Sequence, residues 1–323
     1  MHAIRQYEFG PPETLRYERV LDPVPRDGQV RVGVQASGVH LVDTVIRRGV
    51  TGGPFRLPAL PMTPGREVAG VVDAIGAGVD RGWLGRRVVA HLGQASGGYA
   101  ELALAPTDRL RGIPDSMPAE VAVAMIGTGR TAVGVLDAAA LTADDVVIVT
   151  AAAGGLGSLF AQEATALGAT VVALAGGERK VGVARSLGAR IAVDYQRPDW
   201  PVEVRGTLAG RAATVALDGV GGPVGRAVFE LLGDGGRLVR FGWASGAAAR
   251  IDAEEFAQRG VSETQARIPR EPDALRRLET IALDKAASGA WQPLTETFPL
   301  PRACAAHAAL ESRATTGKVV LVP

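Results

Sequence analysis

The apolar residues follow two different patterns along the chain, and the change falls near residue 120. Before it, short apolar runs bounded by Gly and Pro, such as residues 29–34, 68–72 and 87–90, predict a compact β-rich domain. After it, apolar runs of strand length alternate with segments of helix length, which is typical of βαβ units on a parallel sheet. The pattern therefore predicts an α/β protein in which a β-rich domain precedes a doubly wound domain.

Five strands and three helices are predicted in the doubly wound domain. The strands are expected at residues 146–150, 170–175, 191–194, 214–217 and 237–241, and the helices at 156–167, 178–187 and 224–232. Right-handed crossovers between such strands form a doubly wound sheet. The segment 261–265 is more polar than a buried strand. The pattern therefore does not decide whether a sixth strand forms there, or whether two chains pair edge to edge on it.

The last fifty residues or so follow a third pattern. An amphipathic helix is expected at residues 272–288, a short strand at 296–298, a second helix at 301–311 and a final strand at 318–322. We expect this tail to return to the first domain. The predicted organisation is a first domain at 1–120, a second at 121–266 and a returning C-terminal segment at 267–323.

Composition narrows the classes of partner. Thirty-five basic and thirty-four acidic residues give a formal net charge of +1, which favours neither nucleic acid nor an anionic membrane. The single cysteine, Cys304, excludes an intramolecular disulfide and a cysteine cluster for structural zinc. The first ten residues lack the apolar core of a signal peptide, and no uninterrupted apolar stretch is long enough for a membrane span. We expect a cytoplasmic protein whose partners are small molecules.

A glycine-rich turn follows the first strand of the second domain. The segment 151–157 reads AAAGGLG and runs directly into a predicted helix, which is the context that a dinucleotide-binding fingerprint requires. Set against G-x-G-x-x-G, the register is Ala152, Gly154 and Gly157, with alanine in place of the first glycine. The amides at the start of the helix would then face the diphosphate.

The end of the second strand decides which dinucleotide is expected. NAD enzymes usually carry a carboxylate there for the ribose 2′-hydroxyl, but this strand ends in Gly176 and Gly177. Small residues leave room for a 2′-phosphate, and Arg179 and Lys180 offer cations to pair with it, although both also suit a solvated first helical turn. Glu178 could cap the helix or reach the ribose. The pattern favours NADPH over NADH.

Motifs along nearly the whole chain resemble the quinone oxidoreductases, the zeta-crystallin-like group of the zinc-free medium-chain dehydrogenases/reductases. They are SGVHLVD at 37–43 followed by RRG, PGREVAG at 64–70, GYAE at 98–101, the glycine-rich turn, FG at 241–242 followed by ASG, and LESRATTGK at 310–318. The resemblance implies a GroES-like first domain, a Rossmann second domain, and reduction of quinones or related conjugated carbonyls by NADPH.

By position, the resemblance also implies cofactor contacts. They fall on His40, Leu41, Val42, Asp43, Thr131, Ala153, Gly154, Gly155, Leu156, Gly176, Gly177, Lys180, Tyr195, Phe241, Gly242, Trp243, Ala244 and Arg313. Tyr195 also follows the third strand, at the carboxyl edge of the sheet where ligands bind, although an aromatic residue there could simply cap the core.

No metal is expected. Alcohol dehydrogenases share this superfamily, and their catalytic zinc is held by Cys and His ligands. The matching positions hold His40 and Arg66, and a guanidinium stays protonated and cannot ligate a metal.

Without a metal, the simplest chemistry is direct hydride transfer to an electron-poor acceptor, with hydrogen bonds to the oxygen that gains charge. His40 is the leading donor or acid candidate, or it only positions the cofactor. Asp43 belongs to the same catalytic loop. It is expected either to brace this loop or to pair with Arg47. Val45 replaces a tyrosine of characterised relatives and Trp243 replaces a common asparagine, so both are expected to line the substrate pocket.

The sequence thus predicts a homodimeric, NADPH-dependent quinone reductase. Reduction of an activated C=C bond in an enal, enone or enoyl thioester needs the same parts and stays an alternative. An NADPH-binding sensor or crystallin-like protein without turnover is the alternative of a different class.

Overall fold

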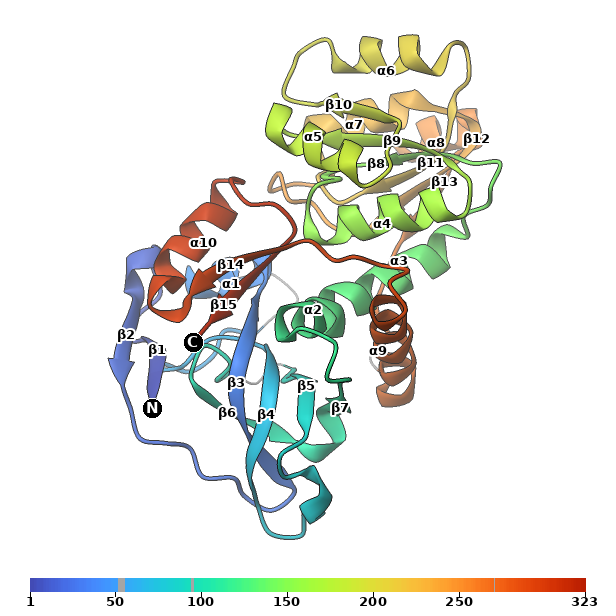
Figure 1. The fold of residues 1–323 in the computed structure, drawn as a ribbon. Helices are drawn as coiled ribbons and strands as arrows, with labels where there is room; N and C mark the ends of the chain where they lie inside the picture. Colours follow the sequence, from blue (N-terminus) through green and yellow to red (C-terminus); the bar gives the residue numbers. More distant parts are fainter. Residues whose placement is uncertain (52–55, 94–95, 270) are drawn as a thin grey trace. The chain divides into compact units, whose positions relative to one another are not determined.

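A computed structural model describes residues 1–51, 56–93, 96–269 and 271–323. The chain forms two compact units (Figure 1). The first unit contains Met1–Thr128, Ala286–Ser288 and Pro293–Pro323, and the second contains Gly129–Lys285 and Gly289–Gln292.

The first unit is built on a seven-stranded sheet centred on the long strand β3. Its strands are β14 (Thr295–Pro299), β15 (Lys318–Val322), β3 (Gln29–Val39), β4 (Glu67–Ile75), β5 (Arg87–His91) and β7 (Leu110–Gly112) in spatial order, with β6 (Leu102–Pro106) also paired to β3. Alternate residues Val30, Val32 and Val34 are buried in one hydrophobic core with residues of β4, β5 and β6. Period-two burial is what the alternating sequence of this strand dictates.

The two ends of the chain meet in this unit. Strands β1 (His2–Gln6) and β2 (Leu15–Arg19) form an antiparallel pair, and β15 pairs antiparallel with β3, so that Val319 lies opposite Val39. Ile4, Val319 and Leu321 share a core with α10 (Ala303–Glu311). The remaining helices are α1 (Leu41–Arg47), α2 (Ala119–Ala124) and the short 3-10 turns Pro12–Thr14, Arg81–Trp83, Thr107–Arg109 and Leu300–Arg302.

The second unit is a six-stranded parallel sheet, as the apolar runs predict. In spatial order the strands are β10 (Ile191–Asp194), β9 (Thr170–Ala175), β8 (Val146–Val149), β11 (Ala213–Asp218), β12 (Leu232–Arg240) and β13 (Ser262–Gln265). Numbered along the chain, this order is 3-2-1-4-5-6, the doubly wound order whose direction reverses between β8 and β11. Ligands of such sheets bind at the carboxyl ends of the strands beside that reversal.

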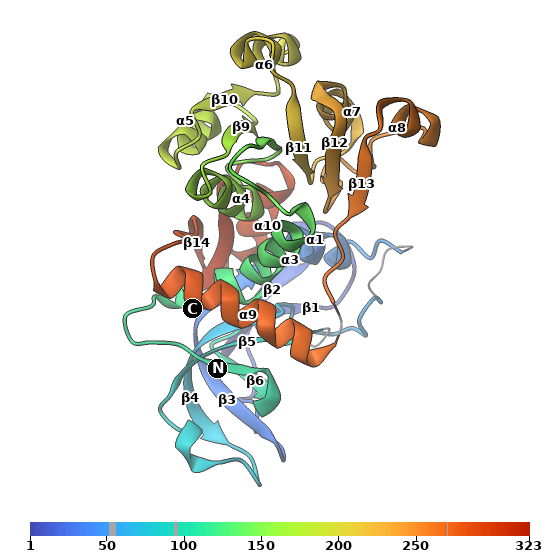
Figure 2. The same cartoon turned by 90° about the vertical axis from the view of Figure 1, so that its right-hand side faces the viewer.

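Helices cover both faces of this sheet (Figures 1 and 2). The helices of this unit are α3 (Arg130–Ala139), α4 (Gly155–Ala166), α5 (Glu178–Ser186), α6 (Trp200–Leu208), α7 (Gly222–Leu231), α8 (Ala253–Arg259) and α9 (Pro272–Ala287). Of these, α9 packs beside α3 and not on the sheet. Trp200, Val204 and Phe229 of α6 and α7 pack with Ile148 and Val172 of the strands in one core. The strands are buried on both faces, which explains why they are almost continuously apolar.

β8, β11 and β14 differ from their predicted bounds by one residue at one or both ends, and β12 and β13 differ more. β12 begins at Leu232, five residues earlier than the prediction at 237, because the Gly-rich segment 232–236 gives no strand signal. The polar segment that left a sixth strand open does form β13, paired in parallel with β12. All four of its side chains are exposed, so its polar composition fits an edge strand and not a buried one.

The unit boundaries also differ from the predicted domains. The first unit extends to Thr128, and residues 267–285, including most of α9, lie in the second unit and not with the returning tail. α9 is fixed there because Leu278 contacts α3 at Gly134, and Glu279 forms a 3.0 Å ion pair with Arg130. Of the predicted returning tail, Ala286–Ser288 and Pro293–Pro323, which contain β14, β15 and α10, belong to the first unit.

One helical run was not predicted. α2, a π-helical segment at Met125–Gly129 and α3 form a continuous run from 119 to 139. Its length and apolar composition would suffice to cross a membrane, but 61% of its apolar window is buried within the protein. Such burial is typical of a core helix.

Candidate active site

The turn after β8 has the shape of a pyrophosphate site. Ala151 adopts a left-handed backbone with φ of 49°, and its carbonyl accepts the Gly154 N–H at 2.8 Å, just before α4 begins. A Cβ on Gly157 would lie 2.8 Å from the carbonyl carbon of Ala151 and from Cα of Ala152, which are backbone atoms that cannot give way. Only glycine fits at 157, so helix and strand approach closely and the first amides of α4 remain available to an anion.

The next two strands end in a second group of predicted residues. Gly177, with φ of 85°, donates its N–H to Asp194 Oδ1 at 2.8 Å, and Gln196 N–H donates to the same oxygen at 2.9 Å. A Cβ on Gly176 would lie 3.3 Å from the hydroxyl of Tyr195, so this hydroxyl borders the glycine pair. The Asp194 carboxylate therefore shapes the loop around Gly176, Gly177 and Tyr195, a role that the sequence did not suggest.

The segment after β12 completes the carboxyl edge of the sheet. The ring of Phe241 packs edge to face on Phe160 with centroids 5.0 Å apart, and Ala244 N–H donates to the Gly219 carbonyl at 2.8 Å. Trp243 is 50% exposed, and Gly242 precedes it in the same segment. Ala153 lies in the turn after β8, and Gly155 and Leu156 begin α4. Lys180 lies in the first turn of α5, whereas Thr131 lies on α3 and not in an edge loop.

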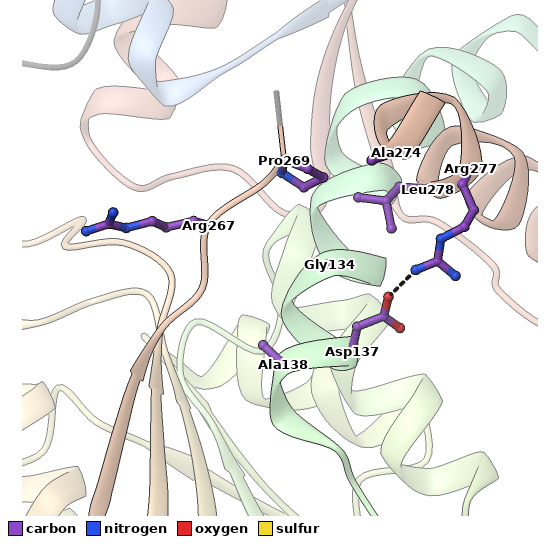
Figure 3. Close-up of a pocket in the computed structure, with 8 residues that line it drawn as sticks. All are labelled: Gly134, Asp137, Ala138, Arg267, Pro269, Ala274, Arg277 and Leu278. Carbon is purple, nitrogen blue, oxygen red and sulfur yellow. Dashed lines mark hydrogen bonds and ion pairs between the residues drawn. The ribbon is translucent and has the colours of Figure 1, made fainter. Parts of the chain in front are cut away.

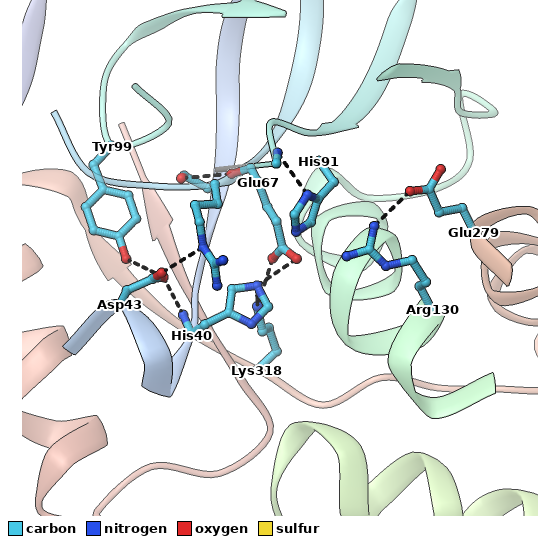
Figure 4. Close-up of polar contacts among 11 residues, drawn as sticks. His40, Asp43, Glu67, His91, Tyr99, Arg130, Glu279 and Lys318 are labelled. Carbon is cyan, nitrogen blue, oxygen red and sulfur yellow. Dashed lines mark hydrogen bonds and ion pairs between the residues drawn. The ribbon is translucent and has the colours of Figure 1, made fainter. Parts of the chain in front are cut away.

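In the first unit, three charged or titratable side chains meet where β3 is flanked by β4 and β15. His40 follows β3, Glu67 opens β4 and Lys318 opens β15 (Figure 4). His40 Nε2 lies 2.7 Å from Glu67 Oε1, Lys318 Nζ lies 2.8 Å from Glu67 Oε2, and Lys318 Nζ lies 2.9 Å from His40 Nε2. Glu67 and Lys318 are buried, whereas the His40 side chain is 21% exposed.

Burial and charge oppose each other in this cluster. Burial alone would raise the pKa of Glu67, but the charges of His40 and Lys318 outweigh it and hold the pKa well below its ordinary value. Burial lowers the pKa of Lys318, and the Glu67 carboxylate opposes that shift. Removing one partner of such a buried pair costs much more than the pair contributes, because an uncompensated charge stays buried.

Asp43 braces the loop that carries His40. Its carboxylate accepts the His40 backbone N–H at 2.8 Å, Arg66 Nε–H at 3.1 Å and the Tyr99 hydroxyl at 3.2 Å. Burial would raise the pKa of Asp43, but the positive charge of Arg66 helps to hold it below the ordinary value. The alternative pairing of Asp43 with Arg47 is wrong, because Arg47 turns to α10 and pairs with Glu311 at 2.8 Å.

The donor set at the zinc-ligand positions does not suit a metal. The Arg66 guanidinium is directed at Asp43, and the Lys318 ammonium lies beside both His40 and Glu67. Within the described residues, no three His, Cys, Asp or Glu side chains are grouped as metal ligands.

The other predicted residues are spread over both units. Leu41 and Val42 form the first turn of α1, Val45 lies further along that helix, and Arg313 follows α10 in the first unit, whereas Trp243 belongs to the second. A pocket of about 370 Å³ lies between α3 and α9 (Figure 3), and none of the predicted site residues lines it. Its lining residues are Gly134, Asp137, Ala138, Arg267, Pro269, Ala274, Arg277 and Leu278.

Sequence reasoning gave no role to Glu67 or Lys318. The available signal was a charged residue at the start of an otherwise apolar strand, in residues 67–72 and 318–322. A lone charge in such a run indicates a buried partner, but 251 residues separate these two, so the partner could not be identified from spacing.

Comparisons with known proteins agree with this architecture. Residues 26–115 match the family model of the alcohol dehydrogenase GroES-like domain, and residues 155–280 match that of zinc-binding dehydrogenases. The chain is 30% identical to a quinone oxidoreductase of Sus scrofa over 327 residues, covering 100% of this chain and 98% of that protein. It is 30% identical to a 2-haloacrylate reductase of Burkholderia sp., covering 98% and 97%.

A solved structure of Escherichia coli quinone oxidoreductase complexed with NADPH matches the fold with a TM-score of 0.88 and 28% identity, covering 100% of both chains. The chain has the GroES-like and Rossmann domains that the resemblance implied. This protein belongs to the quinone oxidoreductase family of the medium-chain dehydrogenases/reductases and is an oxidoreductase.

Proposed function

We propose that this chain is an NADPH-dependent reductase of quinones, working by direct hydride transfer without a metal. The observation that carries the proposal is the turn after β8, where Gly157 admits no side chain and no side chain caps the first turn of α4. The match to a quinone oxidoreductase complexed with NADPH supports it.

The residues at the carboxyl edge of the sheet fit NADPH. β9 is followed by Gly176 and Gly177, without the carboxylate that binds a ribose 2′-hydroxyl, and the nearby carboxylate of Asp194 already accepts two backbone N–H groups. Arg179 and Lys180 follow in the first turn of α5 and supply positive charge for a 2′-phosphate. When bound, NADPH supplies the hydride.

In the first unit, His40 donates a hydrogen bond to the substrate that accepts the hydride. A quinone that gains a hydride develops negative charge on an oxygen, which a hydrogen-bond donor stabilises before a proton arrives. The His40 ring is held on one side by Glu67 and is partly exposed, so it can donate to that oxygen. Asp43 and Arg66 hold the loop and touch neither substrate nor cofactor in this role.

Reduction of an activated C=C bond is the second candidate. The 30% identity to a 2-haloacrylate reductase favours it, because that protein's name describes such a substrate. Val45 and the half-exposed Trp243 differ from the residues usual in quinone reductases, and we propose that both line the acceptor pocket.

An acceptor panel tests both candidates. NADPH oxidation is followed with 1,4-benzoquinone or 9,10-phenanthrenequinone, and in parallel with trans-2-hexenal or crotonyl-CoA. The proposal expects turnover with the quinones. Turnover with the alkenes alone would favour the second candidate, and tight NADPH binding without any turnover would leave the non-catalytic alternative.

We also propose a cytoplasmic homodimer. The exposed edge strand β13 is one surface on which such a dimer could form. Sedimentation equilibrium would give the mass of two chains, and a single-chain mass would contradict this assembly; cell fractionation tests the location.

A further inference from the structure

A neutral amide lies against the glycine pair that follows β9. Strands β9 and β10 are parallel neighbours and their register places Ala175 beside Asp194, so the residues after the two strands meet at the carboxyl edge of the sheet. A Cβ on Gly176 would lie 3.2 Å from Gln196 Nε2, and a Cβ on Gly177 would lie 3.7 Å from Gln196 Oε1. The Gln196 side chain therefore lies where a side chain on either glycine would point.

Neither glycine position readily accommodates an acidic side chain of its own. At Gly176 a Cβ would be closer than ordinary van der Waals contact both to the Gln196 amide and to the Tyr195 hydroxyl. Gly177 has φ of 85°, a left-handed backbone that residues with a side chain rarely adopt. An NAD enzyme uses a carboxylate at the end of this strand to bind the ribose 2′-hydroxyl. Here a neutral amide from the loop after β10 occupies that place.

Backbone hydrogen bonds fix the residue that carries this amide. Asp194 Oδ1 accepts the Gly177 N–H at 2.8 Å and the Gln196 N–H at 2.9 Å, so one carboxylate oxygen joins the glycine pair to Gln196. Between them, Tyr195 N–H donates to the Ala175 carbonyl at 3.1 Å. The Gln196 side chain itself is exposed, so its amide is available to a ligand. A binding group on a fixed backbone discriminates better than one on a mobile loop.

The chemistry of an amide suits a phosphate. An amide donates and accepts hydrogen bonds and carries no charge, whereas a carboxylate only accepts them. An amide at this place can donate to a 2′-phosphate oxygen, and a carboxylate at the same place would repel the phosphate. The positive charge that attracts the phosphate comes from Arg179 and Lys180 in the first turn of α5.

We propose that Gln196 is a specificity-determining residue of the cofactor site. Its amide takes the place of the carboxylate that binds a ribose 2′-hydroxyl, and it donates a hydrogen bond to the 2′-phosphate. The inference rests on the proposed function, because that function names NADPH as the hydride donor. It assigns part of the choice between the two cofactors to a side chain that carries no charge.

Gln196→Glu is the sharpest test, because it adds a negative charge with almost no change in shape. Fluorescence titration without any acceptor gives the Kd of each cofactor. We expect NADPH to bind about 10²-fold more weakly, because the carboxylate repels the 2′-phosphate, and NADH to bind at least as tightly as in the wild type, because the carboxylate accepts the ribose hydroxyl. The side chain is exposed, so the unfolding temperature without ligand should not change.

Gln258→Glu is the matched control for the added charge. Gln258 is also exposed and lies near the end of α8, before β13 begins and therefore at the opposite edge of the sheet. This variant should keep the wild-type Kd for both cofactors. Adenosine fragments locate the effect: Gln196→Glu should weaken 2′,5′-ADP as much as NADPH and should not weaken 5′-AMP.

Gln196→Leu separates the hydrogen bond from simple packing, because leucine covers the glycines without donating. We expect about tenfold weaker binding of NADPH and a Kd for NADH within about threefold of the wild type. Equal changes for the two cofactors in either Gln196 variant, or an unchanged Kd for NADPH, would overturn the proposal. Binding needs no turnover, so a protein that shows this selectivity but reduces no quinone refutes the proposed function and supports the role of Gln196. A wild type that binds neither cofactor refutes both.

Discussion

At the scale of single residues, His307 illustrates how burial fixes a protonation state. Its ring is fully buried, with Nδ1 3.5 Å from Arg47 Nη1 and Nε2 3.2 Å from the Tyr99 oxygen. Arginine only donates, and the Tyr99 hydroxyl donates to Asp43, so Nδ1 accepts and Nε2–H donates. These contacts suit a neutral ring, and burial lowers the pKa of His307 to about 4.

This state makes stability depend on pH. The pKa falls from 6.5 in the unfolded chain to about 4 in the folded one, so the unfolded chain binds more protons between these values. The free energy of unfolding therefore decreases as the pH is lowered from 6.5 to 4. The loss amounts to roughly 3 kcal/mol. Urea unfolding at pH 7 and pH 4.5 should show it for the wild type and for His2→Gln, and much less for His307→Gln. An equal loss in His307→Gln would contradict the assignment.

Gly38 gives a second prediction at this scale. In Gly38→Ala the new methyl group overlaps the Glu67 carboxylate, which Gly127 prevents from moving, so we expect a loss of about 1–3 kcal/mol of unfolding free energy. Gly33→Ala on the same strand is the control, because its Cβ would meet only Val71 O at 3.5 Å. Denaturant unfolding of both variants measures the difference, and comparable stabilities would show that the carboxylate has room.

At the scale of elements, the turn between β8 and α4 depends on one glycine. In Gly157→Ala a methyl group would meet the backbone of Ala151 and Ala152 at 2.8 Å, so the helix must move away from the strand. We expect at least a tenfold weaker affinity for NADPH, measured by fluorescence titration, together with about 1–3 kcal/mol of lost stability. Gly182→Ala on α5 has open space and should bind NADPH normally; equal affinities for both variants would refute this role of Gly157.

Elements were predictable where local sequence determines them. β9, β10 and β15 begin and end at the predicted residues, because each is a short apolar run bounded by polar or glycine residues. β12 and β13 were harder, since glycines and polar side chains at a sheet edge carry no periodic signal. The helical run through the π segment at Met125–Gly129 was also missed, because apolar residues on all sides of it give no periodic alternation of polar and apolar positions.

At the scale of the whole molecule, the site depends on contacts between distant parts of the sequence. His40 could be predicted as a candidate because its loop resembles a family motif, whereas its partners Glu67 and Lys318 could not be paired from the sequence. They meet because β3 lies between β4 and β15 in the sheet. Strand order is a property of the folded chain, so local patterns do not reveal which charged residues share a buried position.

Charge on the whole molecule also bears on the choice of cofactor. A net charge of +1 gives no general attraction for the more negative NADPH, so any preference over NADH must come from local cations. Lys180, in the first turn of α5 at the carboxyl edge of the sheet, is the candidate. Arg211 lies just before β11, at the opposite edge, and carries the same charge, so Arg211→Ala is a control for the loss of one positive charge.

Ligand-linked stability tests this preference on the intact protein. A ligand at 100 times its Kd stabilises the folded state by about 2.7 kcal/mol, so NADPH should raise the unfolding temperature more than the same concentration of NADH. Lys180→Ala should reduce the shift given by NADPH and leave that given by NADH unchanged, because only NADPH carries the 2′-phosphate. Arg211→Ala should keep both shifts. Equal reductions for the two cofactors in Lys180→Ala would show that Lys180 contacts a part common to both, and the basis of the preference would then lie elsewhere at this edge.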